Sequence, residues 1–258
     1  EVLGVTASNK IQGHRFHHHG LFTLNNASDY EAELNAAHVI ADFNKRRQLI
    51  VDGIEKAAQA LNGTALLDDD LLDEVTALVE WPVTLVGSFS EDFLQVPPEP
   101  LIYSMKDHQK YFPVKGSNGE LMAKFIFITN IESKDASQVV KGNEKVITPR
   151  LADAEFFYNT DKKQTLESRL DALSTVLFQK QLGTLKEKSA RISAVAAQVA
   201  QLTETNTDMA ARAGLLSKAD LMTDMVLEFP EVQGTMGKYY ALHDGEATDV
   251  AQALEDQY

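Results

Sequence analysis

Apolar residues recur with two different periods along this chain. Over residues 29–61 and 69–80 they return at helical spacing, and Asn62-Gly63 is typical of a helix end. The segments 1–5 and 21–24 are short and mixed in character, which favours strands. The first part of the chain is therefore expected to combine helices with short strands.

The clearest strand pattern lies between Tyr111 and Ile131. Two apolar runs flank the turn Gly116–Gly119, where Asn118-Gly119 favours positive φ, so we expect a β-hairpin. Its second run, FIFITNI, is almost entirely apolar and is predicted to be buried on both faces. Residues 81–89 predict a further strand, and residues 99–108 a helix after the Pro97-Pro98 break.

After Asp135 the sequence shows no convincing strand pattern. Helical patterns cover residues 151–157, 163–173, 186–202, 208–229 and 249–258. We therefore predict an α+β chain with an α/β module over residues 1–160. An all-α domain, truncated at its C-terminus, is predicted over residues 161–258.

Composition restricts the chemistry and the compartment. The 258 residues contain no Cys, which excludes disulfides, thiolate zinc sites and a Cys nucleophile. No apolar run is long enough for a membrane span, and the N-terminus lacks a signal-peptide pattern, so we expect a cytoplasmic protein without membrane contact. Because the chain starts without Met and stops inside a helical pattern, we expect it to be part of a longer protein.

Charge is negative overall but unevenly distributed. The net charge of −14 argues against broad nucleic-acid binding, and DNA is not an expected partner. Residues 61–99 hold nine acids and no Lys or Arg, whereas residues 141–191 hold ten basic residues against seven acids. The second stretch is either an RNA-facing surface or an ordinary solvated face.

The candidate RNA contacts in this stretch are Lys141, Lys145, Arg150, Lys186, Lys188 and Arg191. Pro149 restricts the backbone before Arg150, whose guanidinium could bind a phosphate through two hydrogen bonds. An ion pair with Asp153 or Glu155 is an equally good interpretation of Arg150.

Two histidine motifs could suggest metal binding. In GHRFHHHG, residues 13–20, His17 and His19 would share one face of a strand, but a metal site needs further ligands, so we interpret His17–His19 as a polar loop without metal. In HDGE, residues 243–246, Gly245 follows the His-Asp pair at once, which indicates a loop and Thr248 as the next helix cap. The phosphate-binding, dinucleotide-binding, serine-hydrolase and zinc-protease motifs are absent.

Several longer segments resemble one family, the beta subunit of bacterial glycyl-tRNA synthetase. They occur in order along nearly the whole chain and include VEWPVTLVGSF, LIYSMKDHQKYFPV, NIESKD, GNEKV, RLADAEFF and HDGEATDVAQAL. GHRF is also part of the resemblance, which implies that His14, Arg15 and Phe16 serve packing or an interface.

The resemblance implies a division of labour between two subunits. The alpha subunit would bind ATP, Mg²⁺ and glycine, and the beta subunit would support recognition of tRNA(Gly); no cofactor is expected in this chain. Residues 1–160 would resemble the module also found in the phenylalanyl-tRNA synthetase beta chain. Residues 161–258 would resemble a degenerate HD domain, with Ala219-Asp220 where an HD enzyme carries its His-Asp pair.

Three functions follow from these expectations. The first is a non-catalytic central portion of the beta subunit that supports tRNA recognition and subunit assembly. The second is a pure inter-subunit scaffold without RNA contact, which the net acidity favours. The third, an HD-type metal phosphohydrolase, is disfavoured because Ala219 cannot bind a metal. Editing of mischarged tRNA is not expected of the first module, since no amino acid is smaller than glycine.

Overall fold

The computed structural model describes residues 3–4 and 6–258, and the predicted strand over residues 1–5 lies largely outside them. The chain divides into two compact units. Unit 1 comprises the residues up to Leu94 together with Ser104–Pro149, and unit 2 comprises Gln95–Tyr103 together with Arg150–Tyr258. The break between Pro149 and Arg150 precedes the boundary predicted at 160/161. That boundary concerns the two predicted modules and stays a prediction.

Unit 1 begins with a small antiparallel pair. Strand β1 (Lys10–Gln12) pairs with β2 (Leu21–Thr23), so the strand expected at residues 21–24 is confirmed. A short 3₁₀ turn, η1 (Ala27–Asp29), leads into helix α1 (Tyr30–Ala36).

The single helix predicted over residues 29–61 is two helices, α1 and α2 (Phe43–Ala60). The chain breaks after α1 because His38 adopts a left-handed conformation at φ 61°. It restarts at Asp42, whose side chain accepts a hydrogen bond from Lys45 N–H and caps α2. Asn62, at φ 55°, ends this helical region as expected.

The main sheet of unit 1 is antiparallel with strand order β3-β5-β6-β4. Its strands are β3 (Gly63–Ala65), β4 (Val83–Ser88), β5 (Phe112–Gly116) and β6 (Leu121–Thr129). The predicted hairpin is confirmed as β5–β6, with Gly119 at φ 81° in its turn.

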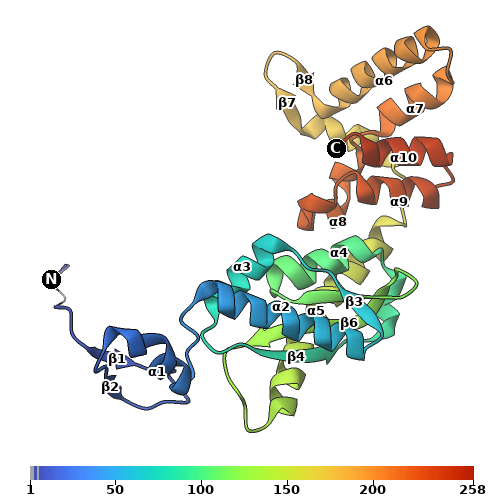
Figure 1. Ribbon diagram of the computed structural model, residues 1–258. Coiled ribbons are helices and arrows are strands. Elements are labelled where there is room, and N and C mark those ends of the chain that lie inside the picture. Colours follow the sequence, from blue (N-terminus) through green and yellow to red (C-terminus); the bar gives the residue numbers. More distant parts are fainter. Residues whose placement is uncertain (1–2, 5) are drawn as a thin grey trace. The chain divides into compact units, whose positions relative to one another are not determined.

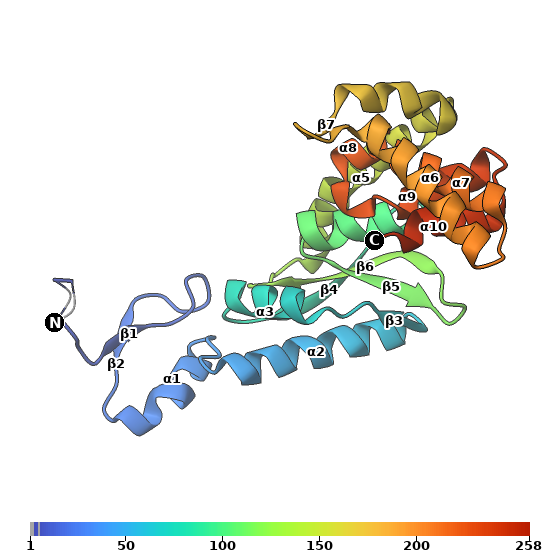
Figure 2. The ribbon, with the colours of Figure 1, turned by 90° about the horizontal axis from the view of Figure 1, so that it is seen from above.

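Helices cover one face of this sheet. Helix α2 and helix α3 (Asp69–Leu78) pack Ile50, Ile54 and Val75 against Ile126 of β6 in one buried cluster. Figures 1 and 2 both show α2 running alongside the sheet. Phe125 and Phe127, which alternate with Ile126, are also buried, so the prediction that β6 is buried on both faces is confirmed.

Helix α5 (Ala136–Asp161) is connected to the sheet by side-chain hydrogen bonds. Glu144 accepts hydrogen bonds from both the backbone N–H and the hydroxyl of Ser88. Asn143 accepts one from the hydroxyl of Tyr111, whose ring stacks on Phe125 at 4.6 Å. The break between the units falls inside this helix, at Pro149.

The chain crosses between the units before α5 as well. A 3₁₀ turn η2 (Glu91–Gln95) precedes helix α4 (Pro98–Tyr103), and a π-helical turn η3 (Ser104–His108) follows it. These two elements match the helix predicted over residues 99–108.

Unit 2 is mainly helical. Its further helices are α6 (Leu185–Leu202), α7 (Thr207–Leu216), α8 (Asp224–Glu228), α9 (Thr235–His243) and α10 (Thr248–Asp256). Three 3₁₀ segments connect them, η4 (Glu167–Thr175), η5 (Ala219–Met222) and η6 (Pro230–Val232). The helix predicted over residues 208–229 is therefore interrupted, and Thr223 caps its last piece, α8.

Two expectations for this part are wrong in detail. A small antiparallel hairpin, β7 (Leu177–Gln179) with β8 (Gly183–Thr184), lies where no strand was predicted. Ala247, rather than Thr248, occupies the N-cap of α10. Within residues 3–4 and 6–258, no helix combines the length and the apolar character that crossing a bilayer requires.

Candidate nucleic-acid interface

The predicted basic residues on α5 are exposed. Lys141 and Lys145 lie one turn apart in the part of α5 that belongs to unit 1, and Arg150 lies in the part that belongs to unit 2. Arg150 forms neither of the ion pairs considered for it, with Asp153 or Glu155. Within the described part of the chain, none of the three side chains makes a hydrogen bond or ion pair. Their charges are therefore available to an external anion.

The predicted basic residues on α6 are more engaged. Lys186 Nζ lies 2.6 Å from a carboxylate oxygen of Asp171 in an exposed ion pair. Lys188 Nζ lies 3.7 Å from the centroid of the Phe178 ring, on the β7–β8 hairpin. Lys188 and Arg191 line one end of an apolar groove along α6. These three residues lie within two turns of α6, and the groove beside Lys188 and Arg191 is lined mainly by aliphatic side chains.

The Ala219-Asp220 position is a packed interior. Both residues are buried in η5, and Asp220 Oδ2 accepts a hydrogen bond of 2.6 Å from the backbone N–H of Gly234. Burial raises the pKa of the Asp220 carboxyl above its ordinary value. Gly237 approaches so closely that an added Cβ would meet Asp220 Oδ2 at 3.1 Å. The carboxylate thus ties η5 to the start of α9.

Two histidines of the segment at residues 13–20 connect it to the loop after β6. His14 is completely buried, and its Nε2 lies 2.6 Å from the carbonyl oxygen of Asn130. His17 Nε2 accepts a hydrogen bond from Glu132 N–H at 3.0 Å. These bonds agree with the packing role expected for His14. Among the described residues, no three His, Asp or Glu side chains are grouped as metal ligands would be.

The HDGE segment also has a structural arrangement. Asp244 accepts a hydrogen bond from Leu166 N–H at 2.7 Å, and burial raises the pKa of its carboxyl. Glu246 binds the guanidinium of Arg212, which also pairs with Glu167 and has its pKa raised by both carboxylates. Gly245 makes the turn at φ 86°. His243 is the last residue of α9 and Asp244 its C-cap, so the predicted loop begins only after His243.

A second deeply buried acid of unit 2 was not found from the sequence. Asp161, which is 1% exposed, accepts hydrogen bonds from Arg169, from the hydroxyl of Tyr240 and from the first N–H groups of α8 at Asp224 and Met225. The ion pair with Arg169 has a length of 3.0 Å. No spacing marks these partners, because they lie 8 to 79 positions away along the chain.

A comparison with family sequence models decides the family of this chain. The model described as glycyl-tRNA synthetase beta subunit matches residues 1–258. The chain belongs to the glycyl-tRNA synthetase beta subunit family.

Curated relatives of this family are similar along the whole chain. The glycine–tRNA ligase beta subunit of Colwellia psychrerythraea is 67% identical over 258 residues, which is 100% of this chain and 38% of the relative. The corresponding subunit of Pseudoalteromonas translucida is 59% identical over 258 residues, again 100% of this chain and 37% of the relative. The chain therefore spans less than two-fifths of the length of the beta subunits that it matches.

Proposed function

We propose that this chain is a non-catalytic central portion of a glycine–tRNA ligase beta subunit that supports tRNA(Gly) recognition and subunit assembly. In this proposal an alpha subunit binds ATP, Mg²⁺ and glycine and attaches glycine to the tRNA. The family match over all 258 residues supports the placement in the beta subunit. The role in RNA binding rests on the unpaired, exposed charges of Lys141, Lys145 and Arg150.

The α5 cations suit a phosphate backbone better than a specific base. Free ammonium and guanidinium groups neutralise phosphates, and the counterions released make binding strongly salt-dependent. The net charge of −14 opposes approach of RNA elsewhere on the surface, so contact is expected to be local. Of the two basic groups, the α5 residues are the stronger candidates, because Lys186 and Lys188 already have partners.

The buried state of Asp220 disfavours the HD phosphohydrolase alternative. Asp220 follows Ala219, which cannot bind a metal, and its Oδ2 accepts a hydrogen bond from the N–H of Gly234. A catalytic metal would need several ligands and an open position. A pure scaffold role remains the alternative to RNA binding, and the acidity of the chain favours it.

The test is the affinity of this chain for tRNA(Gly) and for an unrelated tRNA across a salt series. We expect selective binding that weakens steeply with salt, and a loss of affinity when Lys141 and Lys145 are both changed to Glu. Lys10→Glu with Lys56→Glu, at exposed lysines of β1 and α2, is the matched control because it makes the same change in net charge. Absence of binding at low salt, or equal losses in both variants, would favour the scaffold.

A further inference from the structure

One face of α6 carries a regular repeat of one lysine followed by four apolar residues. Lys188, Ile192, Val195, Val199 and Leu202 follow one another at alternating steps of four and three residues, the spacing of a coiled-coil seam. Val195 is 58% exposed, Val199 52% and Leu202 85%. We call these five residues the α6 seam.

The α6 seam is separate from the face that α6 packs within unit 2. Ser193 points the other way, since its hydroxyl donates to the carbonyl of Ala211 on α7. Gly214 of α7 comes so close that an added Cβ would meet Ser193 Cα at 2.7 Å. Packing against α7 therefore leaves the seam available.

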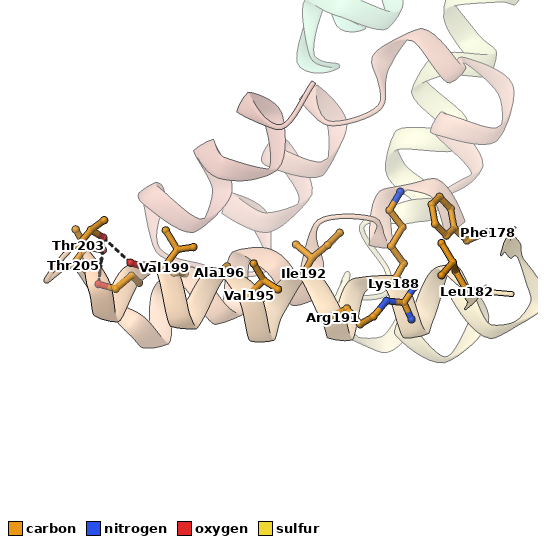
Figure 3. Close-up of a pocket in the computed structure, with 12 residues that line it drawn as sticks. Phe178, Leu182, Lys188, Arg191, Ile192, Val195, Ala196, Val199, Thr203 and Thr205 are labelled. Carbon is orange, nitrogen blue, oxygen red and sulfur yellow. Dashed lines mark hydrogen bonds between the residues drawn. The ribbon is translucent and has the colours of Figure 1, made fainter.

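A groove of about 680 Å³ runs along the α6 seam. Figure 3 shows Phe178 and Leu182 of the hairpin region at one end and Thr203 and Thr205 at the other, with the valines between them. The stretch from residue 188 to residue 203 covers about 22 Å at the α-helical rise. Four turns of a second helix would fit this length.

We propose that the groove binds an amphipathic helix from the part of the beta subunit that lies outside this chain. Its apolar stripe would pack on Val195 and Val199, and its acidic side chains would meet Lys188 and Arg191 at the hairpin end. The curated relatives are more than twice as long as this chain, so the same polypeptide has ample sequence to supply the helix. A tethered helix also binds at a high effective concentration.

The chemistry of the groove favours a protein helix over RNA. Single-stranded RNA binds proteins by stacking its bases on aromatic rings, but Phe178 is the one aromatic residue among those that line the groove, and Lys188 lies over its face. Ile192, Val195 and Val199 of the seam are β-branched and Leu202 is also aliphatic, which suits knobs-into-holes packing. This inference does not use the α5 cations, so it stands or falls separately from the proposed tRNA contact.

Site-specific photo-crosslinking in the full-length beta subunit tests the proposal. A photoreactive amino acid replaces Val199 in one protein and Ala194, on the exposed polar face of α6, in the control. We expect position 199 to crosslink to a peptide of the same polypeptide that lies outside residues 1–258 and carries Asp or Glu in a helical apolar pattern. Position 194 should not capture that peptide.

A charge-reversal experiment completes the test. Lys188→Glu with Arg191→Glu should reduce the crosslink from position 199, and Lys in place of the acids of the captured peptide should restore it. Capture of a second copy, of the alpha subunit or of tRNA, or equal capture from both positions, would overturn the proposal. Circular dichroism of each variant establishes that a lost crosslink does not come from unfolding.

Discussion

The imidazole of His14 reaches across the fold of unit 1 to Asn130, with 2.6 Å between His14 Nε2 and the Asn130 carbonyl oxygen. His14 Nδ1 accepts from the backbone N–H groups of Phe16 and His17, at 3.2 and 3.3 Å, so Nε2 carries the proton and donates it. His17 in turn accepts from Glu132 N–H. His14 donates its Nε2 proton to the loop after β6 and His17 accepts a hydrogen bond from it, so both rings hold the N-terminal segment on this loop.

Acid should therefore lower the stability of unit 1, because protonation of His17 removes the acceptor for Glu132 N–H. Burial, followed by the neighbouring rings of His14 and His38, lowers the pKa of His17 below 6.5, and Glu132 opposes this only in part. Below pH 6.5 the unfolded chain binds a proton that folded His17 still excludes, so stability falls as pH drops. We expect His17→Gln, which keeps an acceptor but does not titrate, to flatten the fall of Tm between pH 7.5 and 5.5.

The matched control for this experiment is His19→Gln, because His19 is exposed. It should leave the pH profile of thermal unfolding unchanged. If the His17 and His19 variants behave alike, the acid sensitivity arises elsewhere.

The Asp161–Arg169 pair should contribute far more to stability than an exposed pair. Removing Arg169 leaves the buried carboxylate of Asp161 without its charged partner, and losses of about 3–5 kcal/mol are typical of such changes. We expect Arg169→Ala to lower the free energy of unfolding in urea by that order.

Lys186→Ala provides the comparison. It breaks an ion pair in which the side chains are 50% and 90% exposed, for Lys186 and Asp171, and should cost less than about 1 kcal/mol. Similar losses in both variants would show that the Asp161 network does not hold unit 2 together.

Local sequence patterns predicted those elements that local forces determine. The β5–β6 hairpin follows from its turn residues and from an apolar run too continuous for an exposed strand, and Phe125, Ile126 and Phe127 are buried as expected. The break after α1 was missed, because nothing local marks His38 as left-handed. The β7–β8 hairpin was missed because its strands are two or three residues long and carry exposed apolar side chains such as Leu177.

The candidate site was predictable in its residues but not in their partners. Composition alone identified the basic stretch, yet only the fold separates the unpaired Arg150 from Lys186, whose partner Asp171 lies 15 positions away. The same limit applies to Asp220. The position of Asp220 beside Ala219 suggested a lost metal site. Its hydrogen bond with the N–H of Gly234 could not be predicted, because Gly234 lies 14 positions later, after η6.

Asp220 should behave as a structural carboxyl. Asp220→Ala removes the acceptor for Gly234 N–H and should cost about 1–3 kcal/mol of unfolding free energy. Burial raises the pKa of Asp220, so the folded protein binds this proton more readily than the unfolded chain does. The free energy of unfolding therefore falls as pH rises above 3.8, the ordinary pKa of an Asp carboxyl. Asp220→Asn keeps an acceptor and does not titrate, so it should match or exceed the parent at pH 7.

Urea unfolding of the parent and the Asn variant at neutral and acidic pH measures this difference. The advantage of Asp220→Asn should shrink as the solution is acidified, and added Mn²⁺ should not change the Tm of either protein. A Mn²⁺-dependent rise in Tm that Asp220→Asn abolishes would instead indicate a metal site at this position.

Gly214 should tolerate no side chain, because α6 and α7 touch at this point. An added Cβ would meet Ser193 N at 2.8 Å as well as Ser193 Cα, and backbone atoms cannot rotate away. Gly214→Ala is therefore expected to destabilise the protein by about 1–3 kcal/mol. Gly142→Ala, on the exposed face of α5 with nothing within 4 Å of the new Cβ, should stabilise it by about 0.5–1 kcal/mol through the better helix propensity of Ala. Opposite signs in urea unfolding would confirm the close α6–α7 contact, which leaves the α6 seam facing outward, and equal signs would contradict it.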